Sequence, residues 1–595
     1  MPEPIENYAL IGDCRSAALI GRTGSIDWLC LPRFDSASMF ARILGDENHG
    51  HWSLNPVGAV ECTSRAYDDD TFVLTTRWET ETGIVDVIDW MPHGNDESDL
   101  ARRVVGVSGE VTMEQVLRIR FDYADAMPWV RQTGTDDNPA LTAIAGPDGV
   151  VVHGVRFEPV DHAHRAEFVV RAGETVDTVM TWFPSHKPQR PRQDVDTMLA
   201  DTRAWWRDWA NACHPPGAYD QHVRRSLLVL RALTHESTGG IVAAPTTSLP
   251  EELGGGRNWD YRYVWLRDAA LTLESLMIHG YEQEASEWRD WLLRAIAGDP
   301  EDVQIMYGLS GERRLEESEL TSLPGYEGSA PVRIGNGAFD QFQGDIFGEV
   351  MIALEDTREL GVEEDGFSWS LQVRLLEYVE TQLDRHDNGI WEIRGPLHIF
   401  THSRAMLWAA FDRGIRGVRE YGLPGPDERW EQVRDQLRAE IDERGFDADR
   451  GHFTQHYDTT EVDASLLQLA QIGFVDYDDP RMLGTVAEIE RTLLRDGLPL
   501  RYRTESGVDG LDGDEHPFLT CAFWLVEQYA HSGRIDDATT LMDRLVGLTN
   551  DVGLLSEEYD VEDHRHMGNT PQALSHLSLV RAADAIAMAR GDTVS

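Results

Sequence analysis

The sequence predicts two domains of different class, an N-terminal antiparallel β-sandwich followed by an (α/α)6 barrel. The chain has 595 residues. At roughly 100–200 residues per domain, this length is too great for a single hydrophobic core. Up to about residue 195 apolar residues fall in short alternating segments, and from about residue 196 they recur with a helical period of about 3.6 residues. We therefore expect a β-sandwich domain over 1–195, a linker helix over 196–220 and a barrel domain over 221–595.

Short segments rich in Val and Ile mark the first domain. The clearest are 83–90, 104–111, 149–157 and 166–170. Several of them alternate apolar and polar residues, which is typical of strands with one face on a core, and Gly, Asp and Asn turns separate them. Many short strands with such turns favour an antiparallel sandwich.

The second domain is predicted to be entirely helical. A linker helix over 198–213 ends at His214-Pro215-Pro216-Gly217. Twelve helices in pairs would form six α-hairpins closed into a barrel; a solenoid is the alternative, but no fixed repeat of about 30–45 residues supports it. The expected helices begin near Gln221, Arg267, Gln283, Phe342, Trp369, Thr401, Asp427, Val462, Arg481, Phe518, Asp536 and Pro571.

The most unusual feature of the composition is its large negative net charge. The chain has 53 Lys and Arg against 104 Asp and Glu, a net charge of −51, so it repels phosphate backbones and anionic lipids. This excludes general nucleic-acid or membrane-surface partners. Lys187 is the one lysine, so arginine supplies nearly all the positive charge. Acidic residues spread over the whole chain predict adaptation to concentrated salt, where charge repulsion is screened.

The N-terminus and the cysteines predict a cytoplasmic protein. The first residues have no basic segment, apolar core or twin arginine of a secretory signal, and no run approaches the roughly 20 apolar residues of a membrane span. The cysteines are odd in number, widely spaced and form no C-x-x-C pair. A disulfide framework or a zinc site is therefore not expected.

Four loops between the helices carry candidate chemistry, and the first spans residues 254–268. Its arginines and aspartates can hydrogen-bond vicinal hydroxyls, and its indole faces can stack on sugars. The alternative is a buried Arg–Asp network that fixes the loop, and no G-K-[ST] ending marks a phosphate loop. The candidate sugar-binding residues are Trp259, Asp260, Trp265, Arg267 and Asp268.

The second and third loops offer a pair of carboxyls. In the second loop, 388–395, Glu392 follows Trp391, and burial against an aromatic ring suits a general acid; a solvated surface glutamate is the alternative. In the third loop, 553–560, Glu557 and Glu558 follow an apolar pair, so that one of them can face inward as a base. A helix-capping role for Ser556 is the alternative there.

The fourth loop adds two arginines and a group of acidic residues. Arg501 and Arg503 could both reach sugar hydroxyls. Asp512, Asp514 and Glu515 lack the spacing of a calcium loop, so we predict no metal site.

Taken in order, these loops resemble glycoside hydrolase family 15, the inverting glucoamylases and related α,α-trehalases. The segments 5–14 (IENYALIGDC) and 24–35 (GSIDWLCLPRFD) are similar to the N-terminus of its prokaryotic members, and the resemblance covers nearly the whole chain. It implies the same β-sandwich and barrel. The segment 265–268 (WLRD) matches the family's W-x-R-D element, which implies that Arg267 and Asp268 hold hydroxyls of the terminal glucose.

The resemblance also implies the reacting groups. The Trp391-Glu392 pair matches the general acid loop, and Ser556-Glu557 matches the base loop, with Glu558 only a neighbour of the base. Glu392 would protonate the glycosidic oxygen and Glu557 would activate water on the opposite face, with inversion. Such a pair lies about 6.5–9.5 Å apart, so the barrel must bring the two loops to one mouth.

Four functions stay open at this stage. The first is an exo-acting α-glucoside hydrolase of glucoamylase type, releasing β-glucose from α-glucans or maltooligosaccharides, and the second is an α,α-trehalase. A non-hydrolytic sugar-binding protein is the third. The fourth is a lyase or epimerase with His398, His402 or Tyr502 as base. The expected partner is a neutral α-linked oligosaccharide or disaccharide, with no cofactor required, although some trehalases of this family need phosphate and Mg²⁺; the oligomeric state stays open.

Overall fold

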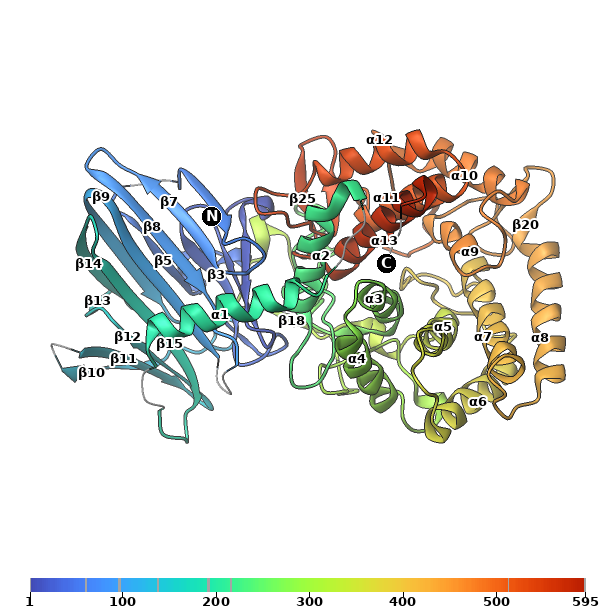
Figure 1. Ribbon diagram of the computed structural model, residues 1–595, viewed down its shortest axis with the longest axis horizontal. Helices are drawn as coiled ribbons and strands as arrows, with labels where there is room; N and C mark the ends of the chain where they lie inside the picture. Colours follow the sequence, from blue (N-terminus) through green and yellow to red (C-terminus); the bar gives the residue numbers. More distant parts are fainter. Residues whose placement is uncertain are drawn as a thin grey trace.

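The computed structural model describes residues 2–58, 61–94, 98–135, 138–189, 193–213, 217–511 and 513–592, except for the side chains of residues 268–271 and 274. A strand domain and a helical domain lie side by side, joined by the helix α1 (Val195–Ala210) (Figure 1). This arrangement confirms the predicted fold class. The expected break at His214, Pro215 and Pro216 lies outside the described residues.

Among the described residues of the first domain, every strand pair is antiparallel, as alternating short segments predict. The strands of this domain are β1 (Ala9–Gly12), β2 (Ala17–Ile20), β3 (Ser25–Cys30), β4 (Ser38–Phe40), β5 (His51–Pro56), β6 (Ser64–Tyr67), β7 (Leu74–Glu79), β8 (Gly83–Trp90), β9 (Asp99–Arg118), β10 (Trp129–Thr135), β11 (Asn138–Ala145), β12 (Asp148–His153), β13 (Glu158–Val160), β14 (Ala163–Arg171) and β15 (Thr175–Pro184).

The long strand β9 joins the two sheets of this domain. Its first half pairs with β8 and β15, and its second half pairs with β5 and β14. The segment 104–111, which the sequence marks as a strand of its own, is the middle of this 20-residue strand. One strand shared by two sheets holds both layers in a fixed relation.

Twelve helices follow α1 in the part of the chain that the structure describes, and each predicted start lies within three residues of an observed helix or 3-10 turn. The Val462 start corresponds to a 3-10 turn over Ala464–Leu467 that leads into α9. The helices are α2 (Asp220–Leu233), α3 (Leu266–Ile278), α4 (Glu282–Ala295), α5 (Asp345–Glu359), α6 (Gly366–Thr381), α7 (Thr401–Arg419), α8 (Asp427–Glu440), α9 (Gln468–Gln471), α10 (Pro480–Thr492), α11 (Leu519–His531), α12 (Ile535–Val546) and α13 (Ala573–Arg590).

Alternate helices form a closed inner ring, which is the (α/α)6 barrel (Figure 1). Contacts run from α3 through α5 and α7 to α9 with its preceding 3-10 turn, from that turn to α11, and through α13 back to α3, and the other helices lie outside. Burial agrees: α11 is buried along nearly its whole length, whereas the outer helix α8 buries Trp430, Val433 and Leu437. An all-round apolar helix belongs inside and an amphipathic one outside. None of the described helices combines the length and apolar character needed to span a membrane.

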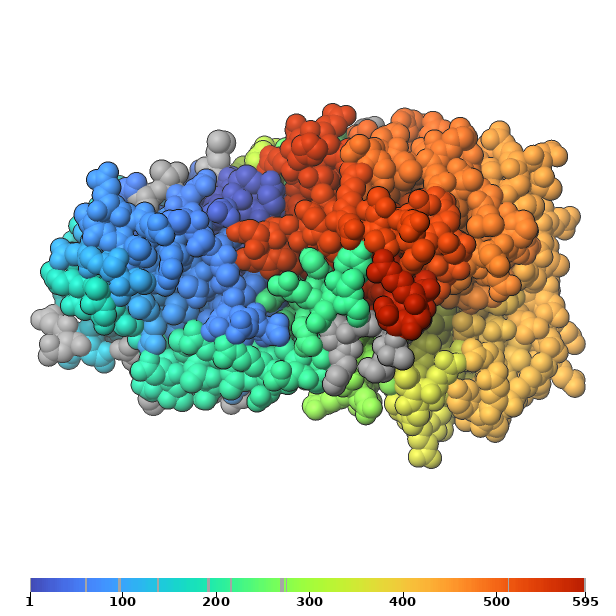
Figure 2. All heavy atoms as spheres, turned by 45° about the horizontal axis from the view of Figure 1, so that its top comes forward, coloured from blue at the N-terminus to red at the C-terminus, as the bar shows by residue number. Residues whose placement is uncertain are grey.

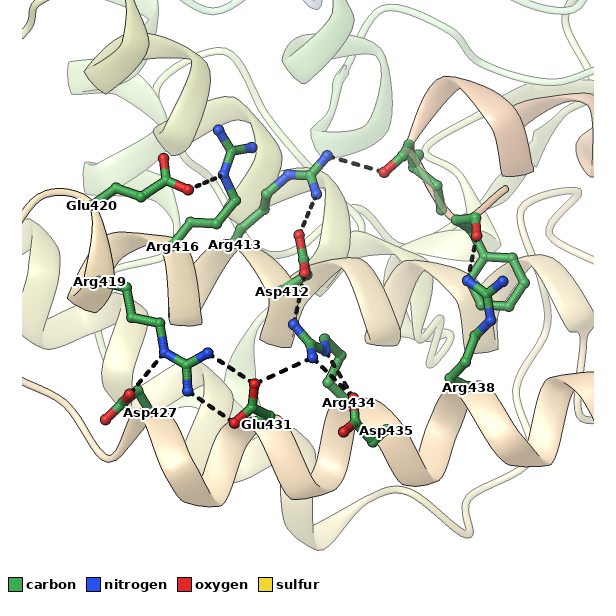
Figure 3. Close-up of polar contacts among 12 residues, drawn as sticks. Asp412, Arg413, Arg416, Arg419, Glu420, Asp427, Glu431, Arg434, Asp435 and Arg438 are labelled. Carbon is green, nitrogen blue, oxygen red and sulfur yellow. Dashed lines mark hydrogen bonds and ion pairs between the residues drawn. The ribbon is translucent and has the colours of Figure 1, made fainter. Parts of the chain in front are cut away.

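The outer surface is held by arginine–carboxylate pairs, as between α7 and α8 (Figure 3). Arg419 binds both oxygens of Glu431, at 2.8 and 2.9 Å. Asp412 of α7 contacts Arg413 at 2.9 Å and Arg434 of α8 at 3.2 Å. Planar guanidinium groups can serve several carboxylates at once, which a lysine cannot do with the same geometry.

The two domains are in direct contact, and N-terminal segments lie against C-terminal ones (Figure 2). The indole nitrogen of Trp28 donates to the carbonyl of Pro245 at 2.7 Å, and Arg65 binds Asp551 at 2.6 Å. Pro245 comes just before the first candidate loop, and Asp551 comes just before the third. The β domain therefore supports the loops at the barrel mouth.

Candidate active site

All four candidate loops contribute to one pocket. It is lined by Ala243, Glu251, Arg257, Trp259, Tyr261, Trp265, Arg267, Asn336, Ala338, Ile390, Trp391, Glu392, Arg394, Arg501, Tyr502, Leu511, Phe518, Glu557 and Gln572. Both predicted reacting carboxyls are in this set, although 165 residues separate them in the chain. The geometry thus brings together groups that the sequence could only suggest separately.

Glu557 is buried and oriented by a neighbouring phenol. The hydroxyl of Tyr261 donates to its Oε1 at 2.5 Å, while its Oε2 accepts no hydrogen bond from any described side chain. Gly568 faces this carboxyl with a φ of 75°, in the left-handed region, and a Cβ there would lie 2.5 Å from Oε2. The glycine therefore leaves the space that the carboxyl occupies.

Helix α13 fixes the loop that carries this glutamate. The backbone N–H of Leu555 donates to Nε2 of His576 at 3.1 Å, and Ser575 Oγ donates to the carbonyl of Ser556 at 2.9 Å. Burial lowers the pKa of His576 to about 3. The imidazole is therefore neutral near pH 7 and keeps an acceptor nitrogen for the loop.

The surroundings of Glu557 favour its protonated form. Burial and the charge of Glu251 raise the pKa of Glu557, and the positive charge of Arg501 opposes them. A carboxyl with a raised pKa is a stronger base once it is ionised. Perturbed carboxyls in a cleft are typical of catalytic sites.

Glu392 has an unusual backbone and two donors beside its carboxyl. Its φ is 58°, in the left-handed region that non-glycine residues rarely adopt. Trp265 Nε1 donates to its Oε1 at 2.6 Å, and the same oxygen lies 3.7 Å from Nη1 of Arg267. Arg267 also binds the carbonyl of Ile390 at 2.8 Å. The strained turn aims the carboxyl into the pocket, where both donors hold it.

The tryptophan beside Glu392 in the chain has a different partner from the one expected. Trp391 lines the pocket, but its Nε1 donates to the buried Asp463 at 2.9 Å. The indole that hydrogen-bonds Glu392 is Trp265 of the first loop. The rings of Tyr261 and Trp265 lie 5.4 Å apart between centroids, so adjacent aromatic side chains of one loop hold the two glutamates.

Arg501 is the centre of a buried carboxyl cluster. Its Nη2 lies 2.9 Å from Glu251, 2.8 Å from Glu515 and 3.0 Å from Glu558. Oxygens of these glutamates lie within 4.8 Å of one another, close enough for a cation, and the guanidinium already contacts all three. Burial raises the pKa of Glu515 and of Glu558.

Arg503 does not share this position. It is half exposed and pairs with Glu461 at 3.3 Å, outside the pocket-lining set. Of the two arginines that competed in the sequence, Arg501 therefore lines the pocket and Arg503 does not.

Asp260 has a structural partner instead of a pocket position. It is fully buried, and Arg262 binds both of its oxygens, at 2.8 and 2.6 Å. Arg262 continues to the carbonyl of Ser36 and the hydroxyl of Tyr123 in the β domain. This is the buried Arg–Asp network that the sequence left as an alternative, so we leave Asp260 out of the proposed sugar-binding set. The side chain of Asp268 lies outside the described residues.

No histidine is among the described residues that line the pocket. His402 is buried and bonded to Gln468 at 2.7 Å, and burial lowers its pKa to about 4. His398 stacks on His456 with centroids 3.9 Å apart. Tyr502 does line the pocket, but its hydroxyl donates to Asp509 at 3.1 Å. These positions do not favour a lyase or epimerase.

Several pocket residues were not singled out from the sequence. Tyr261 lies inside the first candidate loop, but only the fold shows that it reaches Glu557. Arg394 likewise follows the expected acid by two residues. Glu251 and Arg257 carried no separate signal, because acidic and arginine residues are common throughout this chain.

Comparison with known proteins agrees with this arrangement. The family described as "Glycosyl hydrolases family 15" matches residues 217–584, and that described as "Trehalase-like, N-terminal" matches residues 1–183. Neither is a family of cofactor-binding domains.

Relatives similar over the full length are named trehalases. A trehalase from Mycolicibacterium smegmatis is 36% identical, covering 97% of this chain and 90% of that protein. A trehalase from Thermoplasma volcanium is 32% identical, covering 97% and 93%. Among solved structures, a bacterial glucoamylase complexed with acarbose superimposes with a TM-score of 0.72 at 12% identity, over 98% of this chain and 94% of its own. That last likeness shows the fold alone.

Proposed function

Because this chain belongs to the glycosyl hydrolases of family 15, we propose that it is an inverting α,α-trehalase. The observation that carries the proposal is the similarity to trehalases over both domains, at 97% coverage of this chain. The sequence alone favoured a glucoamylase-type enzyme, with trehalase as the alternative. The full-length relatives reverse that order, since the glucoamylase structure supports only the fold.

The pocket residues support a two-carboxyl mechanism. Glu392 gives its proton to the glycosidic oxygen as the C1–O bond breaks. Glu557 takes a proton from water through its free Oε2, and the water oxygen attacks C1 from the opposite face. Tyr261 keeps Oε1 occupied, which leaves the other oxygen for the water. Solvent then returns the proton from Glu557 to Glu392.

The remaining candidates would hold the terminal glucose. Arg267 and Arg501 supply N–H donors that suit pairs of hydroxyls, and Trp265 and Trp391 supply apolar ring surface. Asp268 is proposed to join them on the strength of its motif. A protein that only binds sugars would not need Glu392 and Glu557 in one pocket, which argues against the non-hydrolytic alternative.

The stereochemistry of the products tests the proposal. Both anomeric centres of α,α-trehalose are α. Inverting hydrolysis therefore releases one β-glucose and one α-glucose, and early ¹H NMR spectra should show the two anomers in equal amounts. A retaining enzyme would release α-glucose alone. Maltose, maltotriose and isomaltose are assayed in parallel, with and without phosphate and Mg²⁺, and faster turnover of maltose than of trehalose would sink the trehalase proposal.

Substitution of each carboxyl tests the assigned roles. Glu392→Gln and Glu557→Gln should each lower kcat on trehalose by about 10²- to 10⁴-fold, the usual contribution of general acid–base catalysis. The melting temperature should hardly change. Glu505→Gln is the matched control, because Glu505 is an exposed glutamate paired with Arg495 at 3.5 Å and should keep full activity.

A further inference from the structure

The pocket has a buried end and an exposed end. Side-chain exposure is 10% at Arg501, and Glu557 is only 1% exposed, but it rises to 20% at Glu392 and 32% at Arg394. The proton donor must touch the glycosidic oxygen, which leaves with the departing sugar. That sugar must therefore lie on the exposed side of Glu392, where it can escape to solvent.

Arg394 stands at this exposed end with unused donors. Glu317 binds it through both terminal nitrogens, Nη1 at 3.0 Å and Nη2 at 2.5 Å. A guanidinium has further N–H groups, and those of Arg394 make no hydrogen bond to any residue that the structure describes. Its backbone N–H donates to the carbonyl of Asp509 at 3.0 Å, which fixes the loop behind the side chain.

A second arginine and an indole complete this wall of the pocket. The guanidinium carbon of Arg394 lies 4.2 Å from the ring centroid of Trp259, and that of Arg333 lies 4.7 Å from it. Arg333 follows Val332 in the short hairpin β18 (Ser318–Leu320) and β19 (Val332–Ile334), and its Nε lies 3.5 Å from Glu317. Guanidinium groups cover the indole face that a sugar would otherwise use.

We infer that Arg394, held by Glu317 and stacked on Trp259, binds the hydroxyls of the departing glucose and so makes the enzyme select a sugar leaving group. This inference rests on the proposed hydrolase function and deepens it. The geometry assigns recognition at the exposed end to N–H donors and not to ring stacking. A leaving group without hydroxyls gains nothing from Arg394.

The test compares two substrates that share the terminal glucose. Trehalose leaves a glucose, whereas α-D-glucosyl fluoride leaves only fluoride. Arg394→Gln should lower kcat/KM for trehalose by about 10- to 100-fold, the cost of losing a charged hydrogen-bond donor. It should change kcat/KM for glucosyl fluoride by less than about twofold. Glu317→Gln keeps Arg394 but weakens the contact that holds its side chain. This variant should lower the ratio of kcat/KM for trehalose to kcat/KM for glucosyl fluoride, but by less than Arg394→Gln does.

Arg419→Gln is the matched control. Arg419 also binds a glutamate through both terminal nitrogens, but it does so at the end of α7 against the outer helix α8, outside the pocket-lining set. The ratio of kcat/KM for trehalose to kcat/KM for glucosyl fluoride should therefore stay at its wild-type value. Undiminished activity on glucosyl fluoride also shows that the Arg394 variant is folded.

Equal losses on both substrates, or no loss on either, would overturn the inference. If the wild-type enzyme hydrolyses maltose and not trehalose, the proposed trehalase function fails by itself. The ratio of maltose to glucosyl fluoride then decides the role of Arg394 in the same way, because maltose also leaves a glucose.

Discussion

As the proposed general base, Glu557 meets two opposing requirements. In that role it is shielded from bulk water beside the reacting carbon, yet it must be ionised to take a proton from the attacking water. Burial and the charge of Glu251 raise its pKa, while Arg501 draws it back down. Arg501 also pairs with three other carboxyls, so its positive charge is shared among several groups and lowers the pKa of Glu557 only in part.

The pH profile should report this balance. A base must be ionised, so kcat/KM falls as pH decreases through its pKa, and the acidic limb should lie above the usual carboxyl value of 4.5. Glu251→Gln removes one cause of the shift and should move the limb to lower pH. The measurement is kcat/KM on trehalose between about pH 4 and 9. A limb that stays in place or moves upward would contradict this account.

Asp345 gives a second pH prediction, for stability. It is fully buried at the start of α5, and neither of its oxygens has a hydrogen-bond partner among the described residues. Burial and the charge of Asp387 raise its pKa from 3.8 to about 7. Between these values the unfolded chain is ionised and the native one keeps its proton, so stability falls as pH rises. A shift of roughly three units corresponds to about 4 kcal/mol.

Asp345→Asn removes this dependence. The melting temperature of the variant, relative to wild type, should rise between pH 5 and pH 8. Calorimetry at the two pH values in the same salt measures the difference. A constant difference would show that Asp345 is ionised at both.

Single residues were predictable where a short motif surrounds them. Glu392, Glu557 and Arg267 each belong to a short motif of neighbouring residues. All three could therefore be assigned to one pocket from the sequence. Asp260 could not be separated from its neighbours, because an aspartate two residues from an arginine can bind either that arginine or a sugar.

At the scale of elements, the two loops that carry the proposed catalytic carboxyls depend on unusual backbone conformations. Glu392 adopts a positive φ, and Gly568 must have no side chain because a Cβ would lie 2.5 Å from the Oε2 of Glu557. The hydrogen bond from the backbone N–H of Leu555 to His576 then holds this loop against α13. These constraints fix the position of each carboxyl in the pocket.

Gly568→Ala tests the spatial constraint on the base loop. The added methyl should push the carboxyl of Glu557 aside and lower kcat by about 100-fold, since misplacement by about 1 Å costs that much. Gly473→Ala is the matched control: it has a similar φ of 77° with nothing within 4 Å of a Cβ. Similar losses of activity in both variants would contradict the steric explanation.

Helices were easier to predict than strands for a physical reason. An outer helix repeats its apolar positions every turn, so periodicity locates α8 from Trp430, Val433 and Leu437 alone. A strand shared by two sheets changes its buried face along its length, and β9 was seen only in part, as 104–111. Contacts between loops, such as Tyr261 to Glu557, have no local signal at all.

At the scale of the whole molecule, charge is the unbalanced quantity. If every one of the 53 basic residues neutralised one carboxylate, 51 of the 104 would still be unpaired. The arginine–carboxylate pairs between α7 and α8 show how one arginine contacts several carboxylates at once, as Arg434 does with Asp412 and Asp435 (Figure 3). Exposed pairs of this kind contribute only about 0–1 kcal/mol each. These pairs cannot offset the electrostatic repulsion among the surplus carboxylates, summed over the whole surface.

Salt should therefore stabilise this protein. At 1 M the Debye length falls to about 3 Å, which screens the long-range repulsion of the surplus carboxylates more than it weakens pairs in direct contact. The melting temperature should rise steadily with KCl from dilute buffer to molar concentration. Because the proposed substrate is neutral, kcat/KM per folded molecule should stay nearly constant over the range in which the protein is fully folded. A flat or falling melting temperature would refute salt adaptation and leave the hydrolase assignment untouched, whereas a steep change in kcat/KM of the folded enzyme would point to a charged group in substrate binding.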